Sequence, residues 1–180
     1  FIKLGQALST RPDLVRQDWL LELTNLQDNL PAFDHKIALE IIEEELGAPA
    51  HKLFDEFPDS PIASASLGQV YKAKTKDNNY LAVKVQRPNL NFLIRRDVVI
   101  LRILAITFSP FLPLNIGVGI GEIIDEFGKA LFDEIDYEKE GKNALKFADL
   151  FKDNPNVFIP SLEKKFSSKR IITTSWIDGV

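Results

Sequence analysis

Apolar residues in the first third of the chain recur three or four positions apart, which is the spacing of one face of a helix. Leu20, Leu23 and Leu26 form one such stripe, and Pro31 would end that helix because proline cannot continue it. The stretch Lys3–Ser9 looks like the end of an earlier helix. We expect these leucines to pack in a hydrophobic core.

A second helical stripe follows directly and carries its own start and stop signals. Ile37, Ile41 and Ile42 lie on one face, Asp34 is placed to cap the first turn, and Gly47 is placed to end the helix in a left-handed conformation. These isoleucines are also expected to face the core.

After residue 60 the pattern changes to the alternation of β-strands. Gln69–Ala73 and Tyr80–Gln86 flank a polar turn at Lys76–Asn79, which predicts a hairpin. Alternate residues of the second strand face opposite sides: Leu81, Val83 and Val85 on one side, and Ala82, Lys84 and Gln86 on the other. Lys84 is therefore expected on a rigid strand, opposite an apolar face.

The remaining segments predict helices followed by two strands. Leu90–Ile106 and Glu122–Phe151 read as helical, and the second has apolar residues on one face: Ile123, Phe127, Leu131 and Phe132. Val157–Ile159 and Arg170–Trp176 are expected to be strands. The fold class is therefore α+β, a small antiparallel sheet with helices packed on it, in which residues 1–57 form a helical extension and residues 58–180 the sheet-containing part.

Composition narrows the function classes. The 180 residues are 45% hydrophobic and 27% charged, which is typical of a globular chain. A net charge of −4 without a basic stripe argues against nucleic acid as a partner. Cysteine is absent, which excludes disulfides and thiolate metal ligands, and we expect no metal site in this chain.

One stretch has the hydropathy of a membrane span but contains breaks. Residues 98–120 include Arg102, and Pro110 and Pro113 would interrupt a helix near its middle. We interpret it as a buried helix followed by an apolar loop, with contact to a membrane surface as the alternative. The chain contains no methionine, so we interpret it as a piece of a longer protein in which any targeting segment lies upstream.

The hairpin is laid out like the phosphate-binding loop of a protein kinase. The pattern G-x-G-x-x-G-x-V falls on Ala63, Ala65, Gly68 and Val70, and a strand lysine follows at Lys84. Two of the three glycines are thus alanines. Alanine disfavours positive φ and adds bulk, so we expect a stiffer loop and an altered phosphate geometry.

An acidic run supplies candidate partners for the lysine. Asp136 and Glu140 are four residues apart and would share a helix face, whereas Glu134 and Asp136 would point in opposite directions. Either residues 133–140 form one helix and only one set of carboxylates serves a site, or the helix restarts near Asp136 and leaves Glu134 on an irregular corner. We favour the restart.

Four motifs occur together in one order: Lys3-Leu4-Gly5-Gln6, Ala63-Ser64-Ala65-Ser66, Ala82-Val83-Lys84 and Glu134-Ile135-Asp136. In this they resemble the K-x-G-Q motif, alanine-rich loop, lysine strand and E-x-D motif of the UbiB (aarF-domain) family of atypical protein-kinase-like proteins. The resemblance covers essentially the whole chain and implies a kinase-like N-terminal lobe with family-specific helices, ending at the hinge before the C-terminal lobe.

The resemblance also implies roles for residues. Glu140 would pair with Lys84, and Lys3 would contact the acidic motif, most simply at Glu134, across the place where a peptide substrate would lie. The implied catalytic set is Lys84, Glu140, Lys3, Glu134 and Asp136. The implied nucleotide contacts are Ala63, Ser64, Ala65, Ser66, Gly68, Val70, Ala82 and Lys84, with Ser175, Trp176 and Ile177 at an adenine-binding hinge.

The function implied by the resemblance is ATP binding by an atypical kinase or ATPase that supports quinone or isoprenoid-lipid metabolism at a membrane. ATP and Mg²⁺ would be the cofactors, with the metal ligands in the C-terminal lobe, so the fragment alone should be inactive. Partners would be membrane lipid or quinone-pathway proteins, in a cyanobacterial or plastid setting. The alternative is a non-catalytic nucleotide-sensing scaffold that binds lipid or protein partners.

Overall fold

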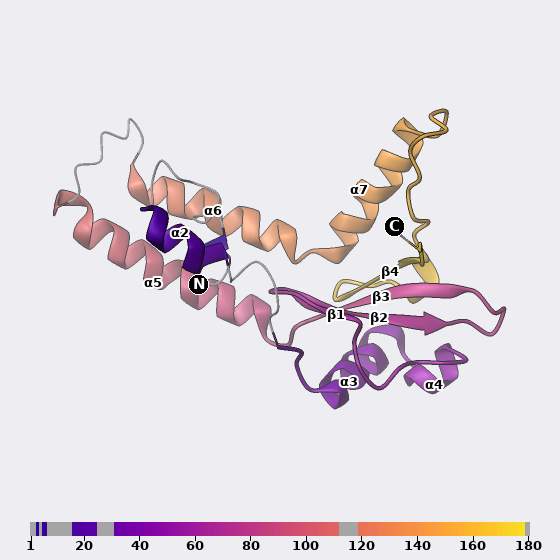
Figure 1. The fold of residues 1–180 in the computed structure, drawn as a ribbon. Helices are drawn as coiled ribbons and strands as arrows, with labels where there is room; N and C mark the ends of the chain where they lie inside the picture. Colours follow the sequence, from indigo (N-terminus) through magenta and orange to yellow (C-terminus); the bar gives the residue numbers. More distant parts are fainter. Residues whose placement is uncertain (1–2, 4, 7–15, 25–30, 112–118, 179–180) are drawn as a thin grey trace.

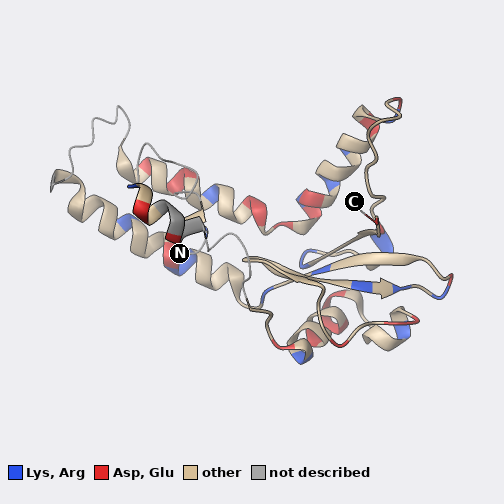
Figure 2. Cartoon of the chain, in the orientation of Figure 1, with Lys and Arg blue, Asp and Glu red and all other residues tan. Residues whose placement is uncertain are grey.

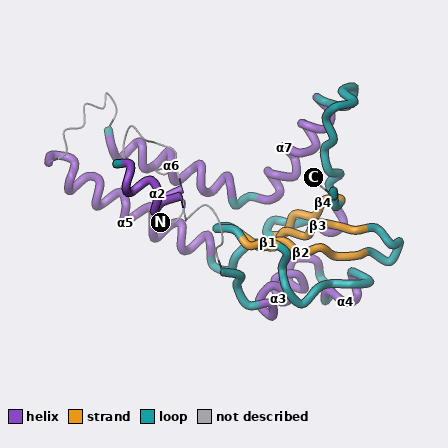
Figure 3. The backbone as a smooth tube through the Cα atoms, viewed as in Figure 1, coloured by secondary structure: helices purple, strands orange, loops and turns teal. Residues whose placement is uncertain are grey.

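The computed structural model of the protein describes residues 3, 5–6, 16–24, 31–111 and 119–178. Helices and a small sheet alternate in the order expected from the sequence (Figures 1 and 3). The elements are α2 (Gln17–Thr24), α3 (His35–Leu46), α4 (Ala50–Leu53), β1 (Ala63–Ser64), β2 (Gly68–Lys74), β3 (Tyr80–Gln86), α5 (Leu90–Phe108), η1 (Ser109–Phe111), α6 (Ile120–Glu134), α7 (Tyr137–Leu150), η2 (Lys164–Phe166) and β4 (Ile171–Ser175).

The sheet has four antiparallel strands in the order β1-β2-β3-β4. The expected hairpin is confirmed, and Asn78 adopts a left-handed conformation in its turn, with φ of 66°. The expected strand at Val157–Ile159 is wrong. That segment is irregular, the following Pro160 has no N–H to donate to a ladder, and pairing with β4 begins only at an isolated bridge between Leu162 and Thr174.

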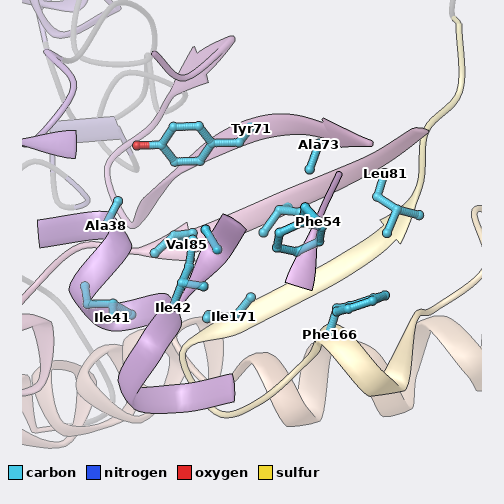
Figure 4. Close-up of a cluster of buried hydrophobic side chains, with 12 residues drawn as sticks. Ala38, Ile41, Ile42, Phe54, Tyr71, Ala73, Leu81, Val85, Phe166 and Ile171 are labelled. Carbon is cyan, nitrogen blue, oxygen red and sulfur yellow. The ribbon is translucent and has the colours of Figure 1, made fainter. Parts of the chain in front are cut away.

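Helices α3 and α4 cover one face of the sheet and form the main core with it (Figure 4). Alternate residues of β3 point into this core, as expected, and Val83 and Val85 are fully buried. The predicted ends of α3 are confirmed: the Asp34 side chain accepts a hydrogen bond from the Lys36 N–H at 2.8 Å, and Gly47 is left-handed. The core therefore includes residues on both sides of the predicted division at residue 57.

Helices α5 and α6 pack as a pair beside the sheet and have a second, smaller core. Leu90 and Ile94 of α5 are buried against Leu131 of α6. The interpretation of residues 98–108 as a buried helix is wrong for the outer face, because Val99 and Ile103 are 56% and 60% exposed. No helix among the described residues has the length and apolar character needed to cross a membrane.

Three of the sequence predictions reach beyond the described residues. Lys3, Gly5 and Gln6 are helical, but the rest of Lys3–Ser9 lies outside the described part of the chain. The packing of the leucine stripe at Leu20, Leu23 and Leu26 and the break at Pro113 also lie outside it.

Candidate nucleotide site

Lys84 and Glu140 form the ion pair on which the sequence interpretation depends. The Lys84 ammonium donates to both Glu140 carboxylate oxygens, with Nζ–Oε distances of 3.0 and 2.9 Å. Lys84 is held in the middle of β3 by strands on both sides, and Glu140 lies in the first turn of α7. The pair is half-buried, so the amine stays accessible while its position is fixed.

The acidic motif lies where one helix ends and another begins. Helix α6 ends at Glu134, and α7 starts at Tyr137 with Asp136 as its N-cap, whose carboxylate accepts a hydrogen bond from the Lys139 N–H at 3.0 Å. The predicted restart is therefore confirmed, but Glu134 is the last residue of helix α6 and not part of an irregular corner. Asp136 caps α7 and lines a separate polar cavity beside Gln86, not the cavity of Lys84 and Glu140.

Three lysine–carboxylate pairs surround this corner. In addition to Lys84–Glu140, Lys3 pairs with Glu134, as expected, and the Lys139 Nζ lies 2.6 Å from an Asp133 carboxylate oxygen. Figure 2 shows the acidic residues gathered where α6 meets α7. All members of these pairs except Lys3 border a cavity of about 600 Å³, lined by Leu67, Lys84, Ala130, Asp133, Glu134, Lys139, Glu140 and Asn143.

The aromatic ring of Tyr137 packs against the Lys84 ammonium. The ring is almost fully buried, and the Lys84 Nζ lies 4.6 Å from the ring centroid, a cation–π distance. The Tyr137 hydroxyl is buried and has no hydrogen-bond partner in the described part of the chain. Burial, with smaller contributions from the Glu140 and Glu134 carboxylates, raises the pKa of Tyr137 well above its ordinary value, so the hydroxyl stays neutral.

Gly68 is needed for space and not for its backbone angles. A Cβ at this position would lie 2.6 Å from the Val85 carbonyl oxygen and 2.7 Å from the Tyr137 hydroxyl. No described glycine other than Gly47 has a positive φ, and neither Ala63 nor Ala65 does. The loop thus follows a path that alanine adopts without strain, which explains why two glycines are dispensable here.

The alanine-rich loop is attached to the end of β3. Arg87 donates to the Ala65 carbonyl at 2.9 Å and to the Ser64 hydroxyl at 3.0 Å. Ser66 faces a different cavity, a mostly apolar one of about 280 Å³ between the loop, α5 and α6. Leu67 is the loop residue that reaches the cavity of Lys84 and Glu140.

The sheet face opposite the core offers a shallow surface beside the lysine. Strand pairing places Val70 and Ala82 on the same face as Lys84, together with Thr174. These side chains are small and only half-buried. Two of the predicted nucleotide contacts, Val70 and Ala82, therefore lie beside Lys84, and their contact with a nucleotide stays a prediction.

At the predicted hinge the backbone N–H groups of the three residues differ in whether they already make a hydrogen bond. The Ser175 N–H donates to the Ser161 carbonyl at 2.9 Å and the Trp176 N–H to the Tyr80 carbonyl at 3.0 Å, so both are engaged. The Ile177 N–H has no hydrogen bond among the described residues. Of the three predicted hinge residues, Ile177 is therefore the one that can donate to a ligand.

No three histidine, cysteine or acidic residues in the described ranges are arranged to hold a metal ion. The donors that suit a nucleotide are the Lys84 ammonium, the loop and the Ile177 amide. Lys84 is oriented by Glu140 and lies beside the polar cavity, so it is placed to bind a phosphate, and ATP as the ligand stays a prediction at this point.

Three contributors to the site were absent from the sequence predictions. They are Arg87, Tyr137 and Lys139. For Tyr137 the sequence offered a signal: it lies three residues before Glu140, a spacing that places both residues on one helix face. The contacts of Arg87 are long-range and leave no local pattern.

Comparisons with known proteins agree with this geometry. The profile of the ABC1 atypical kinase-like domain matches residues 25–180. The Synechocystis protein slr1919 is 49% identical over 179 residues, covering 99% of this chain and 32% of that protein. The protein ACTIVITY OF BC1 COMPLEX KINASE 1, chloroplastic, from Arabidopsis thaliana is 42% identical over 181 residues, covering 100% of this chain and 26% of that protein.

A solved structure has the same fold. The Mycobacterium tuberculosis protein Rv3197, in its complex with erythromycin, superposes with a TM-score of 0.68 at 27% identity, covering 98% of this chain and 44% of that one. The chain spans about a quarter to a third of the length of the curated relatives that it matches.

Proposed function

This chain belongs to the ABC1 atypical kinase-like (aarF/UbiB) family, and we propose that it forms the ATP-binding lobe of an atypical kinase or ATPase. The observation that carries the proposal is the bidentate Lys84–Glu140 ion pair at the edge of a polar cavity. In kinase-type phosphoryl transfer, a strand lysine held by a helix glutamate positions the phosphates.

The chain's own residues would act by positioning. Lys84 would donate to the α- and β-phosphates while Glu140 keeps its ammonium in place, and the half-buried face at Val70 and Ala82 would receive the adenine ring. The Ile177 N–H would bond the adenine edge. Mg²⁺ would neutralise the phosphates, with its ligands in the part of the relatives that this chain does not span.

The ion pair of Lys3 with Glu134 supports a departure from ordinary peptide phosphorylation. It ties the N-terminal motif to the corner of α6 and α7, beside the cavity in which a phosphate acceptor would have to approach. We infer that this contact restricts access to bulky acceptors. Hydrolysis of ATP or transfer to a small acceptor is the activity that this arrangement favours.

Nucleotide binding and ATP turnover by the full-length protein test the proposal, with Lys84→Ala and Lys3→Ala beside the wild type. Lys84→Ala should weaken ATP binding by about tenfold or more, because a charge-assisted contact to phosphate is lost. Lys3→Ala should change turnover more than binding. Lys76→Ala, in the exposed turn between β2 and β3 and outside the cavity, serves as the control for loss of a lysine.

Unchanged ATP affinity in Lys84→Ala would overturn the assignment of the site. Binding without turnover in the wild-type protein would instead favour the alternative function, a nucleotide-sensing scaffold.

The wider role rests on the relatives. Relatives from a cyanobacterium and from chloroplasts suggest a cyanobacterial or plastid origin. We propose that the complete protein supports quinone or isoprenoid-lipid metabolism at a membrane, with membrane lipid or quinone-pathway proteins as partners. Disruption of the gene followed by measurement of prenylquinone content tests this: an unchanged content would argue against it.

A further inference from the structure

Arg87 makes an unusual number of contacts for a residue at the end of a strand. Its backbone N–H donates to the Leu67 carbonyl at 2.9 Å, and its guanidinium donates to the Ala65 carbonyl at 2.9 Å and the Ser64 hydroxyl at 3.0 Å. One arginine thus binds the last residue of β1 and two of the three residues between β1 and β2. The planar guanidinium can hold such divergent acceptors at once, whereas a lysine ammonium is a single point charge.

The same guanidinium also reaches the segment before α3. Its Nη2 donates to the Pro31 carbonyl at 2.6 Å, and the Phe33 ring centroid lies 5.7 Å from its central carbon. The segment is fixed a second time, because the Phe33 N–H donates at 3.0 Å to the side chain of Gln69, which is fully buried in β2. Arg87 therefore joins this segment, the end of β3 and the loop in one unit.

Fixing a carbonyl also fixes the neighbouring amide. In a trans peptide the C=O and N–H point in opposite directions, and no described peptide bond is cis. The contacts of Arg87 with the Ala65 and Leu67 carbonyls thus set the directions of the Ser66 and Gly68 N–H groups. These amides belong to the loop that would cover the phosphates.

We propose that Arg87 is a positioning residue that holds the alanine-rich loop, residues 63–68, over the nucleotide and couples its position to the segment 31–34. The proposal rests on the function proposed above. Arg87 itself touches no phosphate; it acts through the loop. Displacement of the segment 31–34 would move the Pro31 carbonyl and, through Arg87, the loop.

The test compares Arg87→Lys and Ser64→Ala with wild type in the full-length protein. Two quantities are measured: hydrogen exchange of the amides in residues 63–68 without nucleotide, and affinity for ATP. Arg87→Lys should speed exchange in the loop and weaken ATP binding, each by about fivefold or more, because the two side-chain hydrogen bonds to the Ala65 carbonyl and the Ser64 hydroxyl are lost, whereas the backbone bond to Leu67 stays. Ser64→Ala should give a smaller change in the same direction, and none when added to Arg87→Lys.

Arg96→Lys is the matched control. Arg96 lies in the next helix and is half-exposed, and its described bonds go only to Asp97. It should leave loop exchange and ATP affinity unchanged.

Each outcome decides the proposal. Unchanged loop exchange in Arg87→Lys overturns it, and so does faster exchange with unchanged ATP affinity. If the wild type binds no ATP, the proposed function fails, whereas the exchange measurement still decides whether Arg87 holds the loop. Uniformly faster exchange across the whole sheet would indicate a merely structural residue and would also overturn the proposal.

Discussion

Gly68 and Tyr137 are the two residues where side-chain volume decides the geometry of the site. The glycine leaves space that the tyrosine hydroxyl fills, and the tyrosine ring then lies under the lysine. Neither residue needs to touch a nucleotide to matter, because each one fixes where Lys84 and the loop lie.

Gly68→Ala should destabilise the protein by about 1–3 kcal/mol, since the new Cβ would overlap a backbone carbonyl and the Tyr137 hydroxyl. Urea unfolding measures the change. Gly121→Ala in α6 is the control: its Cβ would meet nothing closer than 3.8 Å, so stability should stay constant or rise by up to about 1 kcal/mol. Adding Tyr137→Phe should recover part of the loss at Gly68, and no recovery would contradict the described contact.

Tyr137 also predicts a dependence of stability on alkaline pH. Its pKa in the unfolded chain is the ordinary 10.0, and burial raises the pKa in the folded protein. Above pH 10 the unfolded chain loses this proton while the folded protein keeps it, so the free energy of unfolding falls as pH rises, by about 1.4 kcal/mol per pH unit. Tyr137→Phe should flatten this slope.

The flattening should be partial, because burial also raises the pKa of Tyr71. Urea unfolding at pH 9, 10 and 11 would measure it. At neutral pH, Tyr137→Phe should be neutral or slightly stabilising, since a buried hydroxyl without a partner is removed. A strong loss of stability at neutral pH would contradict the absence of a partner.

At the scale of elements, the corner between α6 and α7 decides which carboxylates share a site. Glu134 and Glu140 border one cavity, whereas Asp136 caps α7 and faces another. If Asp136 acts only as a helix cap, its substitution should change stability, whereas substitution of a catalytic carboxylate should change ATP turnover.

Asp136→Asn should leave stability nearly unchanged, because asparagine caps helices as well as aspartate does, whereas Asp136→Ala should cost about 0.5–2 kcal/mol. Asp34→Ala, which removes the equivalent cap of α3, should lower stability by a similar amount. Thermal unfolding and turnover of the full-length variants check both. Loss of turnover in Asp136→Asn at full stability would show a chemical role for the carboxylate itself.

The sequence was most informative where a residue acts on its neighbours in the chain. The cap at Asp34, the stop at Gly47 and the break after Glu134 could be predicted because caps and helix faces are local. Val157–Ile159 was mistaken for a strand because β-branched residues indicate propensity but not the partner strand that a sheet requires. The exposed face of α5 was missed for a related reason: hydropathy does not show which side is covered.

The candidate site shows the same difference between local signals, which could be read from the sequence, and long-range contacts, which could not. The Lys84–Glu140 and Lys3–Glu134 pairs could be predicted only from the resemblance of whole motifs, since 56 and 131 residues separate the partners. The contacts of Arg87 with Pro31 and Ser64 had no motif to indicate them.

At the scale of the whole molecule, the helices before the sheet and the sheet itself share one core. Ile42 of α3 and Phe54 after α4 are buried with Val83 and Val85 of β3. Lys84 lies on the opposite face of the sheet, which is not part of this core and contacts α7 through Glu140.

Ile42→Ala should therefore destabilise the sheet together with α3, by about 2–5 kcal/mol, because a fully buried side chain is truncated in a shared core. Far-ultraviolet circular dichroism and tryptophan fluorescence should show coincident unfolding transitions at a lower urea concentration. Ile103→Ala, on the exposed face of α5, should change stability by less than about 0.5 kcal/mol. Separate transitions for helix and sheet signals would contradict a common core.

The packing of the Tyr137 hydroxyl against Gly68 has a consequence for how the activity of the protein could be regulated. Many kinases are switched off when the helix bearing the lysine's glutamate rotates outward. Here such a rotation would pull an aromatic ring out of the interior and abandon a capped helix start at the same moment. A lobe built in this way would keep its lysine and glutamate engaged at rest, so physiological control would have to operate on access to the cavity and not on the assembly of the pair.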